Sequence, residues 1–504
     1  LVALRTNGKA DASINMDAKG ARSTDEHTQV LLGAMSIGAR PEAKDVAVVG
    51  FGSGLTTHVL LGSPIIERVT TVEIEPAMIE GARHFLPRVH RAFEDPRGTV
   101  RIEDAKTFFF QDGREYDLII SEPSNPWVSG VAGLFSREFY ALTRRFLRPG
   151  GVFCQWLHTY EIDPPLTASV MFALEESFPY YEIYNTNDVD ILILASDRPI
   201  VVDLDYLLQT PEIAEELATI SLRNASDLHA LRVGSEALMG PLFRSFASKT
   251  NSDYFPILDL GAVRTRFLRA DASSYASVAS ASVPLIEMLD PQAPTPSPVT
   301  SNTDNREVKR VGSARFAMAV RDFIANEDFD AGTVPFTATG KRTLLSMLSN
   351  WQRCGGTAED DFWIDNLLTF ASMTVPFLSA QELESMWDQL RTQSCKVFES
   401  PARGAWLKLV HAVSARDATE MLAAARHLLS DAGNAENQRR KRYLVTVAMT
   451  AALASDDPET AMHIWRTHGS TLIANGQTPP ELRLLVAHVA ERLIVEDRLA
   501  SGGG

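Results

Sequence analysis

Between residues 45 and 157, short apolar segments alternate with segments of helical character, and this alternation restricts the possible folds more than any other feature of the chain. The apolar segments are DVAVVGFG (45–52), TTVEIE (70–75), TVRIEDA (99–105), YDLIISEP (116–123) and GGVFCQWL (150–157). Short apolar strands separated by helices are typical of a parallel sheet that is covered on both faces. We therefore predict a doubly wound α/β domain with a mainly parallel sheet.

Further elements are expected around this series. They are a hairpin turn at Asn7-Gly8, a helix at 25–38 and an antiparallel strand, VDILILAS (189–196), added at the edge of the sheet. Residues 1–200 are thus predicted to form one domain with a short N-terminal β-hairpin. Residues 201–289 are predicted to be a mixed, mostly helical extension of that domain.

The remainder of the chain has a different pattern. Residues 290–309 are rich in Pro, Ser and Thr and are predicted to form a linker. The stretches 405–429 and 443–468 each contain an apolar helix, a short turn with Asp and a second Ala-rich helix. This plan predicts an all-α domain of tetratricopeptide-like helical hairpins over 310–500, with an irregular helical bundle as the alternative. Such a domain would suit a protein partner or a dimer contact.

Charge and cysteine content restrict the partners. The 504 residues carry a formal net charge of −16, which would repel a nucleic-acid backbone but tolerate a cationic substrate. The three cysteines, Cys154, Cys354 and Cys395, form no C-x-x-C pair, so neither a disulfide framework nor a metal site is predicted. They fit a reducing compartment, and a cytoplasmic location is expected. No apolar run is long enough for a membrane span.

The first strand runs directly into a glycine-rich turn, VAVVGFGSGLTT (46–57), with Gly50, Gly52 and Gly54. Glycines at such a turn let the backbone approach a ligand closely and adopt positive φ. Glu73 ends the next strand, where a carboxylate can accept both hydroxyl groups of a ribose. A plain tight turn and a solvated carboxylate are the alternatives for each feature taken alone. Together they predict a nucleoside-binding site.

Two further strand ends carry acidic residues. The third strand ends in Glu103-Asp104-Ala105, where Asp104 is in a position to accept from an adenine amino group, although a surface turn would also explain it. The fourth strand ends in Ser121-Glu122-Pro123-Ser124-Asn125-Pro126-Trp127, in which two prolines stiffen the loop. We expect Glu122 to face the reacting centre and Trp127 to exclude water from it. The structural alternative is a simple strand end with local packing of Trp127.

The order of these motifs, followed by L-F-S-R-E-F-Y and L-R-P-G-G, resembles the spermidine synthase (polyamine aminopropyltransferase) family over about residues 1–200. The resemblance implies a fold like that of S-adenosylmethionine-dependent methyltransferases and a role in polyamine biosynthesis. It also implies decarboxylated S-adenosylmethionine as co-substrate and a small amine as acceptor. Family residues for the ribose, the adenine and the substrate pocket match Glu73, Asp104 and Gln29, respectively.

This chain departs from the family at several of these positions. The usual D-S-S-D-P motif is replaced, so that its two aspartates correspond to Glu122, the expected base, and Asn125, expected to contact substrate. Thr28 stands where the family has tyrosine. The pattern S-E-P-S-N-P-W looks like divergent bacterial relatives that are often fused to a membrane-spanning part, which raises the alternative of a tether to the inner membrane preceding Leu1. Asp253, in N-S-D-Y-F-P, resembles a segment of the same relatives and is a further candidate for the substrate site, or an Asx-turn.

The sequence is also compatible with two other functions. The same fold and nucleoside contacts serve methyl transfer from S-adenosylmethionine itself. The segment around Gly52 contains no obvious arginine or lysine for the carboxylate of that cofactor, which mildly favours the decarboxylated form. Because both usual aspartates are missing, a non-catalytic binding module that keeps the fold is the second alternative.

Overall fold

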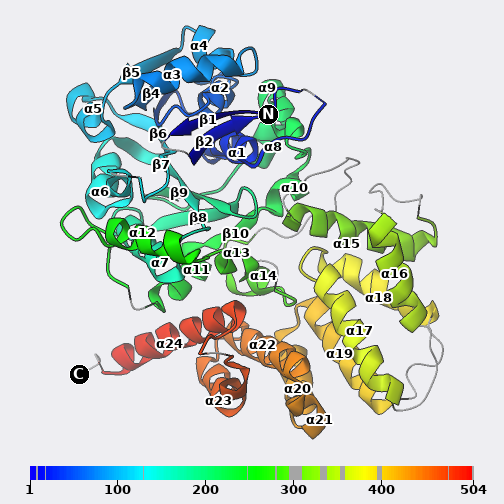
Figure 1. The fold of residues 1–504 in the computed structure, drawn as a ribbon. Helices are drawn as coiled ribbons and strands as arrows, with labels where there is room; N and C mark the ends of the chain where they lie inside the picture. The colour runs from blue at the N-terminus through cyan, green and yellow to red at the C-terminus, as the bar shows by residue number, and fades with distance from the viewer. Residues whose placement is uncertain are drawn as a thin grey trace. The chain divides into compact units, whose positions relative to one another are not determined.

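In the computed structural model the chain forms two compact units (Figure 1). The structure describes residues 1–6, 9–17, 19–128, 130–246, 248–278, 281–293, 309–329, 338–351, 358–393, 400–474 and 476–501. The first unit comprises Leu1–Glu236, Phe246–Ser273 and Asp304–Lys309. The second comprises Ala237–Ser245, Ser274–Thr303 and Arg310–Gly504. The tip of the predicted hairpin (7–8), most of the predicted linker, Cys354 and Cys395 lie outside the described residues.

An eight-stranded sheet forms the centre of the first unit, with the order β10-β8-β9-β7-β6-β3-β4-β5. Its strands are β3 (Asp45–Val49), β4 (Arg68–Glu73), β5 (Gly98–Ile102), β6 (Tyr116–Ser121), β7 (Leu147–His158), β8 (Tyr180–Asn185), β9 (Asp190–Ser196) and β10 (Arg232–Ser235). The five strands from β5 to β7 are parallel. The chain passes from β3 outward to β4 on one side and to β6 on the other, so the predicted doubly wound fold is confirmed, with its topological switch point between β3 and β6.

The antiparallel part of the sheet differs from the prediction. β9 is antiparallel to β7, as expected, but it is not an edge strand, because β8 pairs with its other side. β10 then pairs with β8 and forms the edge. Neither β8 nor β10 was expected from the sequence. A small separate sheet of β1 (Val2–Thr6) and β2 (Lys9–Ile14) precedes the domain, in agreement with the predicted hairpin.

Two groups of helices cover the large sheet. In the first group the other helices contact α1. In the second group each helix contacts the next, from α5 to α6, α7 and α12. The first group contains α1 (Thr24–Ala39), α2 (Leu55–Leu60), α8 (Leu204–Gln209) and α9 (Pro211–Thr219). The second contains α5 (Ala105–Asp112), α6 (Arg137–Arg145), α7 (Pro164–Glu175) and α12 (Ile257–Leu268). Smaller helices α3 (Pro76–Ala82), α4 (Arg91–Glu94) and α10 (Ala225–His229) complete the unit.

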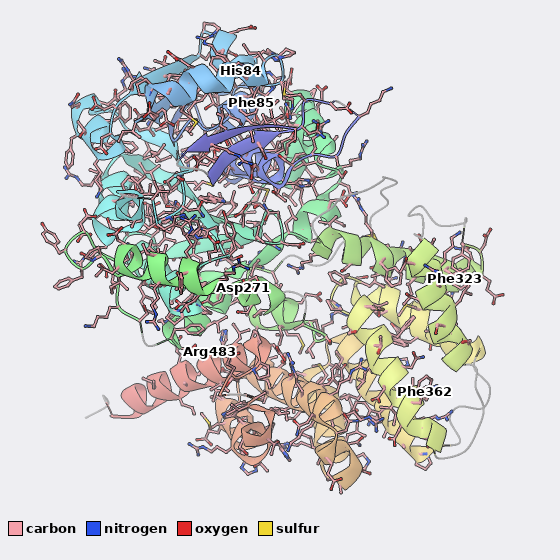
Figure 2. All side chains as sticks on the ribbon, in the orientation of Figure 1. His84, Phe85, Asp271, Phe323, Phe362 and Arg483 are labelled. Atoms are coloured by element: carbon pink, nitrogen blue, oxygen red, sulfur yellow. The ribbon has the colours of Figure 1, made fainter. Side chains whose placement is uncertain are left out.

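The second unit is helical in its described residues. Its helices are α11 (Glu236–Arg244), α13 (Ser274–Ser277), α14 (Leu285–Leu289), α15 (Lys309–Asn326), α16 (Ala338–Trp351), α17 (Ala358–Thr374), α18 (Ala380–Gln393), α19 (Pro401–Ala415), α20 (Ala418–Leu429), α21 (Ala432–Glu436), α22 (Gln438–Ala454), α23 (Pro458–His468) and α24 (Pro480–Ser501). The Asp residues of the two predicted turns, Asp417 and Asp457, are the N-caps of α20 and α23. Arg483 on α24, labelled in Figure 2, donates hydrogen bonds to Ser245 Oγ and to the Ser245 carbonyl oxygen, both at 3.0 Å. None of the helices in the described ranges combines the length and the apolar character that crossing a bilayer requires.

Candidate active site

The glycine-rich turn after β3 brings two strand ends unusually close together. Gly50 has φ +95°, and its N–H donates to the Val72 carbonyl oxygen at 2.9 Å. A Cβ atom at Gly50 would lie 2.4 Å from the carbonyl oxygen of Glu122. Any side chain here would therefore push apart the carboxyl ends of β3 and β6, which is why glycine is required at this point.

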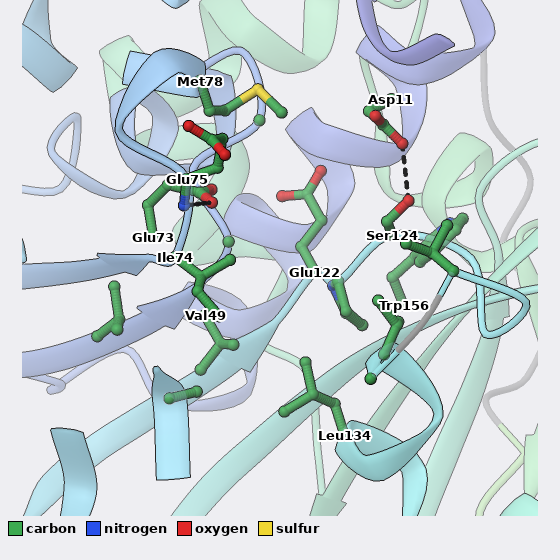
Figure 3. Close-up of a pocket in the computed structure, with 18 of the residues that line it drawn as sticks. Asp11, Val49, Glu73, Ile74, Glu75, Met78, Glu122, Ser124, Leu134 and Trp156 are labelled. Atoms are coloured by element: carbon green, nitrogen blue, oxygen red, sulfur yellow. Dashed lines mark hydrogen bonds between the residues drawn. The ribbon is translucent and has the colours of Figure 1, made fainter. Parts of the chain in front are cut away.

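A cavity of ≈ 480 Å³ lies at the carboxyl ends of β3, β4 and β6 (Figure 3). This is the place where doubly wound domains bind ligands, and the volume suits a small molecule. Eight carboxylate side chains line it: Asp11, Asp25, Glu73, Glu75, Glu103, Asp104, Glu122 and Asp190. Lys106 is the one cationic side chain among the described lining residues, and its Nζ pairs with Asp253 Oδ2 at 2.7 Å. The cavity is therefore strongly acidic.

On one side of the cavity, backbone amides hold the carboxylate of Glu73. Glu73 Oε2 accepts from the Phe51 N–H and Oε1 accepts from the Glu75 N–H, each at 2.9 Å. Figure 3 shows Glu73, Glu75 and Met78 grouped together on this side. The carboxylate of Glu73 is thus fixed beside the glycine-rich turn, as the sequence predicted for these two features.

Asp104 lines the cavity at the start of α5. It is the N-cap of that helix, and its Oδ1 accepts from the Thr107 N–H at 2.9 Å. Its side chain is exposed, and the neighbouring Ala105 is buried in the cavity wall. Asp104 therefore has two effects: it caps α5, and it places a hydrogen-bond acceptor at the cavity.

Glu122 extends into the middle of the cavity from the end of β6 (Figure 3). Its Oε2 accepts from Thr56 Oγ1 at 2.6 Å. Burial raises the pKa of Glu122 to about 7, against the opposing effect of hydrogen bonds from Thr56 and Gln29; the nearby carboxylates of Asp25 and Asp190 raise it further. A carboxylate with a pKa near 7 can exchange a proton at neutral pH.

The first turns of α1 form the wall behind Glu122. This helix begins with a capping box, in which Ser23 accepts from the Glu26 N–H and the Glu26 side chain accepts from the Ser23 N–H. The predicted substrate-pocket residue Gln29 is buried one turn further on and lines the cavity. Its Oε1 accepts from Ser53 Oγ at 2.6 Å, which fixes the orientation of the amide.

Five acidic residues of the cavity were not among the predicted site residues. Glu75 and Glu103 belong to the predicted strand segments TTVEIE and TVRIEDA, and the remaining three are Asp190, Asp25 and Asp11. Asp190 is the first residue of β9, and Asp25 lies in the first turn of α1. Asp11, from the hairpin strand β2, accepts from Ser124 Oγ at 2.7 Å, the hydrogen bond drawn in Figure 3. An aspartate at the start of an otherwise apolar segment, VDILILAS, was a signal for Asp190; the other two carry no comparable signal.

Four of the predicted site residues do not line the cavity. Gly54 is the N-cap of α2, with φ +84°. Asn125 is buried and its Nδ2 donates to Tyr160 Oη at 3.1 Å. Trp127 packs edge-on against His158, and Asp253 pairs with Lys106. Of the other predicted residues, Gly50, Gly52, Glu73, Asp104, Ala105, Glu122 and Gln29 do line it. Roles for Gly54, Asn125, Trp127 and Asp253 in binding stay predictions.

The fold and the cavity define a class of protein: a doubly wound α/β domain with an acidic cavity at its topological switch point, where ligands of such domains bind. Residues 26–187 match the family model of the spermine/spermidine synthase domain. The chain therefore contains a spermidine synthase-like domain, which confirms the resemblance drawn from the motifs.

Individual relatives agree with this assignment. The spermidine synthase of Dictyostelium discoideum is 38% identical over 125 residues, which cover 24% of this chain and 44% of that protein. A polyamine aminopropyltransferase of Nitrosomonas europaea is 34% identical over 138 residues, 27% of this chain and 42% of that protein. Putrescine N-methyltransferase 2 of Nicotiana tabacum is 29% identical over 212 residues, 39% of this chain and 58% of that protein. The chain thus spans less than two thirds of the length of each of these relatives.

Proposed function

We propose that the first unit transfers an aminopropyl group from decarboxylated S-adenosylmethionine to the nitrogen of a small amine. The observation that carries this proposal is the acidic cavity around Glu122: its described lining has eight carboxylates and one lysine, Lys106, which is already paired with Asp253. A sulfonium nucleoside and an ammonium substrate are both cations. Such a cavity would stabilise the two together, whereas an anionic substrate would be repelled.

The nucleoside would occupy the side of the cavity at the glycine-rich turn. Gly50 and Gly52 leave room for close approach to the backbone, and Glu73 would accept hydrogen bonds from the ribose hydroxyl groups. Its two hydrogen bonds from backbone amides leave further lone pairs on both carboxylate oxygens. Asp104 would accept from the adenine amino group.

Glu122 would act as the general base. A primary ammonium has a pKa of about 10.4, so it must lose a proton before its nitrogen can attack. The Glu122 carboxylate would take that proton, and Thr56 and Gln29 would hold the carboxylate in position. The bound nucleoside supplies an electrophilic carbon on a sulfonium leaving group: a C–N bond forms, the C–S bond breaks, and methylthioadenosine departs. Positioning of this kind lowers a barrier by roughly 7–11 kcal/mol.

The charges of the lining favour the decarboxylated co-substrate. S-adenosylmethionine carries a carboxylate, which would need a donor, and the one lysine among the lining residues that the structure describes pairs with Asp253. The decarboxylated form lacks this carboxylate and keeps the ammonium, to which several carboxylates of the lining are available.

Methyl transfer is the second candidate. The similarity to a putrescine N-methyltransferase over 39% of this chain favours it. Both reactions need the same nucleoside contacts and the same removal of a proton from the amine.

The test is incubation of the full chain with each of the two co-substrates and a panel of small amines, followed by mass spectrometry. We expect the amine to gain one aminopropyl group. A gain of one methyl group would replace the proposal by its alternative. If neither co-substrate gave a product with any amine, both would be wrong.

A further inference from the structure

α12 and the loop that precedes it carry a dense group of exposed apolar side chains. Single exposed apolar residues are ordinary on a protein surface, and the described part of this chain has several. Between residues 254 and 268, however, six large apolar side chains are each at least 60% exposed. They are Tyr254, Phe255, Leu260, Val263, Phe267 and Leu268. A group of this size on one short segment marks an interaction surface.

The helix is held in place by its opposite face. α12 packs against α7 and against the 3₁₀ turn Val131–Phe135, and its buried residues are Leu258, Ala262 and Thr265. Asn251, just before the helix, is buried, and its Nδ2 donates to the carbonyl oxygens of Ala132 and Phe135 at 3.3 and 2.9 Å. Its Oδ1 accepts from the Leu258 N–H at 3.1 Å. Figure 1 shows α12 beside α7 in the first unit, so the exposed side chains stand on a fixed scaffold.

The exposed apolar side chains of the helix form a narrow stripe. Leu260, Val263 and Phe267 are spaced three and four residues apart, so they lie along one line on the helix surface. Such a stripe is the seam by which one helix packs against another. A helix that lies on a lipid surface has instead a polar face rich in Lys and Arg. The spacing therefore indicates a second helix as the partner.

Charged residues border this stripe in a self-complementary order. Asp259 and Arg266 are both exposed, and because they are seven residues apart they lie on the same side of the stripe. Within one copy, Arg266 Nε lies 3.7 Å from Glu161 Oε2, and its guanidinium lies over the ring of Trp127, which keeps it at this position. Asp259 is near the start of α12 and Arg266 is near its end.

This order of charges fits a second copy of the same helix. When two copies pack antiparallel, the Asp259 end of each meets the Arg266 end of the other, which gives two equivalent ion pairs about a twofold axis. An anionic bilayer fits less well, because a carboxylate borders the stripe and the chain carries a net charge of −16.

We propose that α12 is the contact surface of a homodimer, in which the α12 helices of two copies of this chain pack antiparallel about a twofold axis. Leu260, Val263 and Phe267 form the centre of the contact, and Asp259 pairs at its edge with Arg266 of the other copy. Three exposed aromatic side chains per copy, of about 150–250 Å² each, supply a large part of the ~800 Å² per partner that a standard interface buries. The contact lies in the first unit, whereas the sequence suggested the helical domain for a dimer contact. It does not depend on the proposed function.

The experiment is sedimentation velocity of the full chain over a range of micromolar concentrations, without any ligand. We expect a dimer whose fraction rises with concentration. Phe267→Glu places a charge in the centre of the contact once in each copy, so it should raise the dimer dissociation constant by at least about 100-fold. An unmodified protein that is monomeric at every concentration, or a Phe267→Glu dimer as tight as the unmodified one, would overturn the inference.

The matched control is Phe110→Glu on α5. Phe110 is likewise an exposed phenylalanine of the first unit, and it lies outside the proposed contact, so the dissociation constant should stay within about twofold. Thermal unfolding checks the folding of each variant. If Phe267→Glu fails to fold, Leu260→Glu supplies the same test and should weaken the dimer by about tenfold or more. Equal weakening by Phe110→Glu would contradict a contact confined to α12.

Asp259→Arg distinguishes a second copy from a lipid surface as the partner. It places arginines opposite each other across the twofold axis, so the dimer should weaken by about tenfold. If α12 lay on lipid, the same substitution would add positive charge beside the stripe and strengthen co-sedimentation with phosphatidylglycerol vesicles. A monomer that binds such vesicles, and binds them more tightly with Asp259→Arg, would replace the dimer contact by a membrane contact.

Discussion

The two sides of the cavity hold their carboxylates in different ways. On the side of the glycine-rich turn, Glu73 accepts two backbone N–H groups at 2.9 Å, from Phe51 and Glu75. On the other side, Glu122 and Asp190 are held by side chains, and burial raises their pKa values to about 7 and about 6. Under the proposed function, the side fixed by backbone N–H groups would bind the rigid nucleoside. The carboxylates of the other side would become favourable as charged groups when a cationic ligand binds.

The largest effect is expected from a variant on the side of the cavity that holds Glu122 and Asp190. Glu122→Gln removes the proposed base and keeps the shape, so the rate of transfer should fall by ~10²–10⁴-fold, while the affinity for methylthioadenosine stays within about twofold. Rapid-mixing kinetics with mass detection measure the rate, and calorimetry measures the affinity.

The control for this prediction is Glu115→Gln, a neutralisation at an exposed position just before β6 that does not line the cavity. It should leave both quantities unchanged. A Glu122→Gln protein that retains its rate would exclude Glu122 as the base.

The next largest effect is expected from a variant on the side of the glycine-rich turn. Glu73→Gln should weaken methylthioadenosine binding by about 10- to 100-fold, because a hydrogen bond to a charged group contributes ~1.5–3 kcal/mol. Amine binding should not change, since Glu73 lies beside the glycine-rich turn. Glu80→Gln, at an exposed position on α3 outside the cavity, is the control. Equal losses for nucleoside and amine would mean that the two sides are not separate.

Much of this arrangement could be predicted from the sequence because of one geometric rule. The carboxyl ends of parallel strands meet at one edge of a sheet, so the glycine-rich turn, Glu73, Asp104 and Glu122 were expected near one another, and the structure brings them into one cavity. The strand alternation also predicted the parallel half of the sheet and the helices on both faces.

The same rule explains why Asp190 was missed. β9 is antiparallel to β7, with His158 opposite Asp190, so the first residue of β9, and not its last, lies at the cavity edge. The rule that ligand-binding residues follow the carboxyl ends of strands therefore does not identify Asp190. Asn125 and Trp127 follow the same strand end but do not line the cavity, because a loop after a strand can turn away from it and local sequence does not set its direction.

A smaller effect concerns stability. The folded-state pKa of Glu122, about 7, lies above its ordinary value. The contribution of this side chain to the stability of the folded state is therefore complete below pH 4.5 and is lost as the pH rises through 7. Glu122→Gln should therefore stabilise the first unit by about 1–2 kcal/mol at pH 8 and have little effect near pH 4.5. Thermal unfolding of both proteins at the two pH values measures this. Destabilisation at pH 8 would show that the carboxylate is not strained by burial.

The smallest effect is expected when a single hydroxyl group beside Glu122 is removed. Thr56→Val removes the donor at 2.6 Å from Glu122 Oε2, and that hydrogen bond lowers the pKa of Glu122. Without it the pKa rises further, so the rising limb of the pH–rate profile should move to higher pH by about half a unit to one unit. The rate at pH 9 should remain nearly the same, because the base is ionised there in both proteins.

Thr57→Val on the same helix is the matched control, since Thr57 Oγ1 pairs with Thr71 Oγ1 at 2.8 Å and does not contact Glu122. A shift in the Thr57 variant as large as that in the Thr56 variant would mean that general loosening of α2, and not the loss of one hydrogen bond, changes the profile. A shift confined to Thr56→Val would assign the rising limb to Glu122, because in the described structure Thr56 is bonded to that carboxylate and Thr57 is not. The pH profile thus tests the identity of the base independently of the Glu122→Gln variant, whose loss of activity alone could also follow from a displaced substrate.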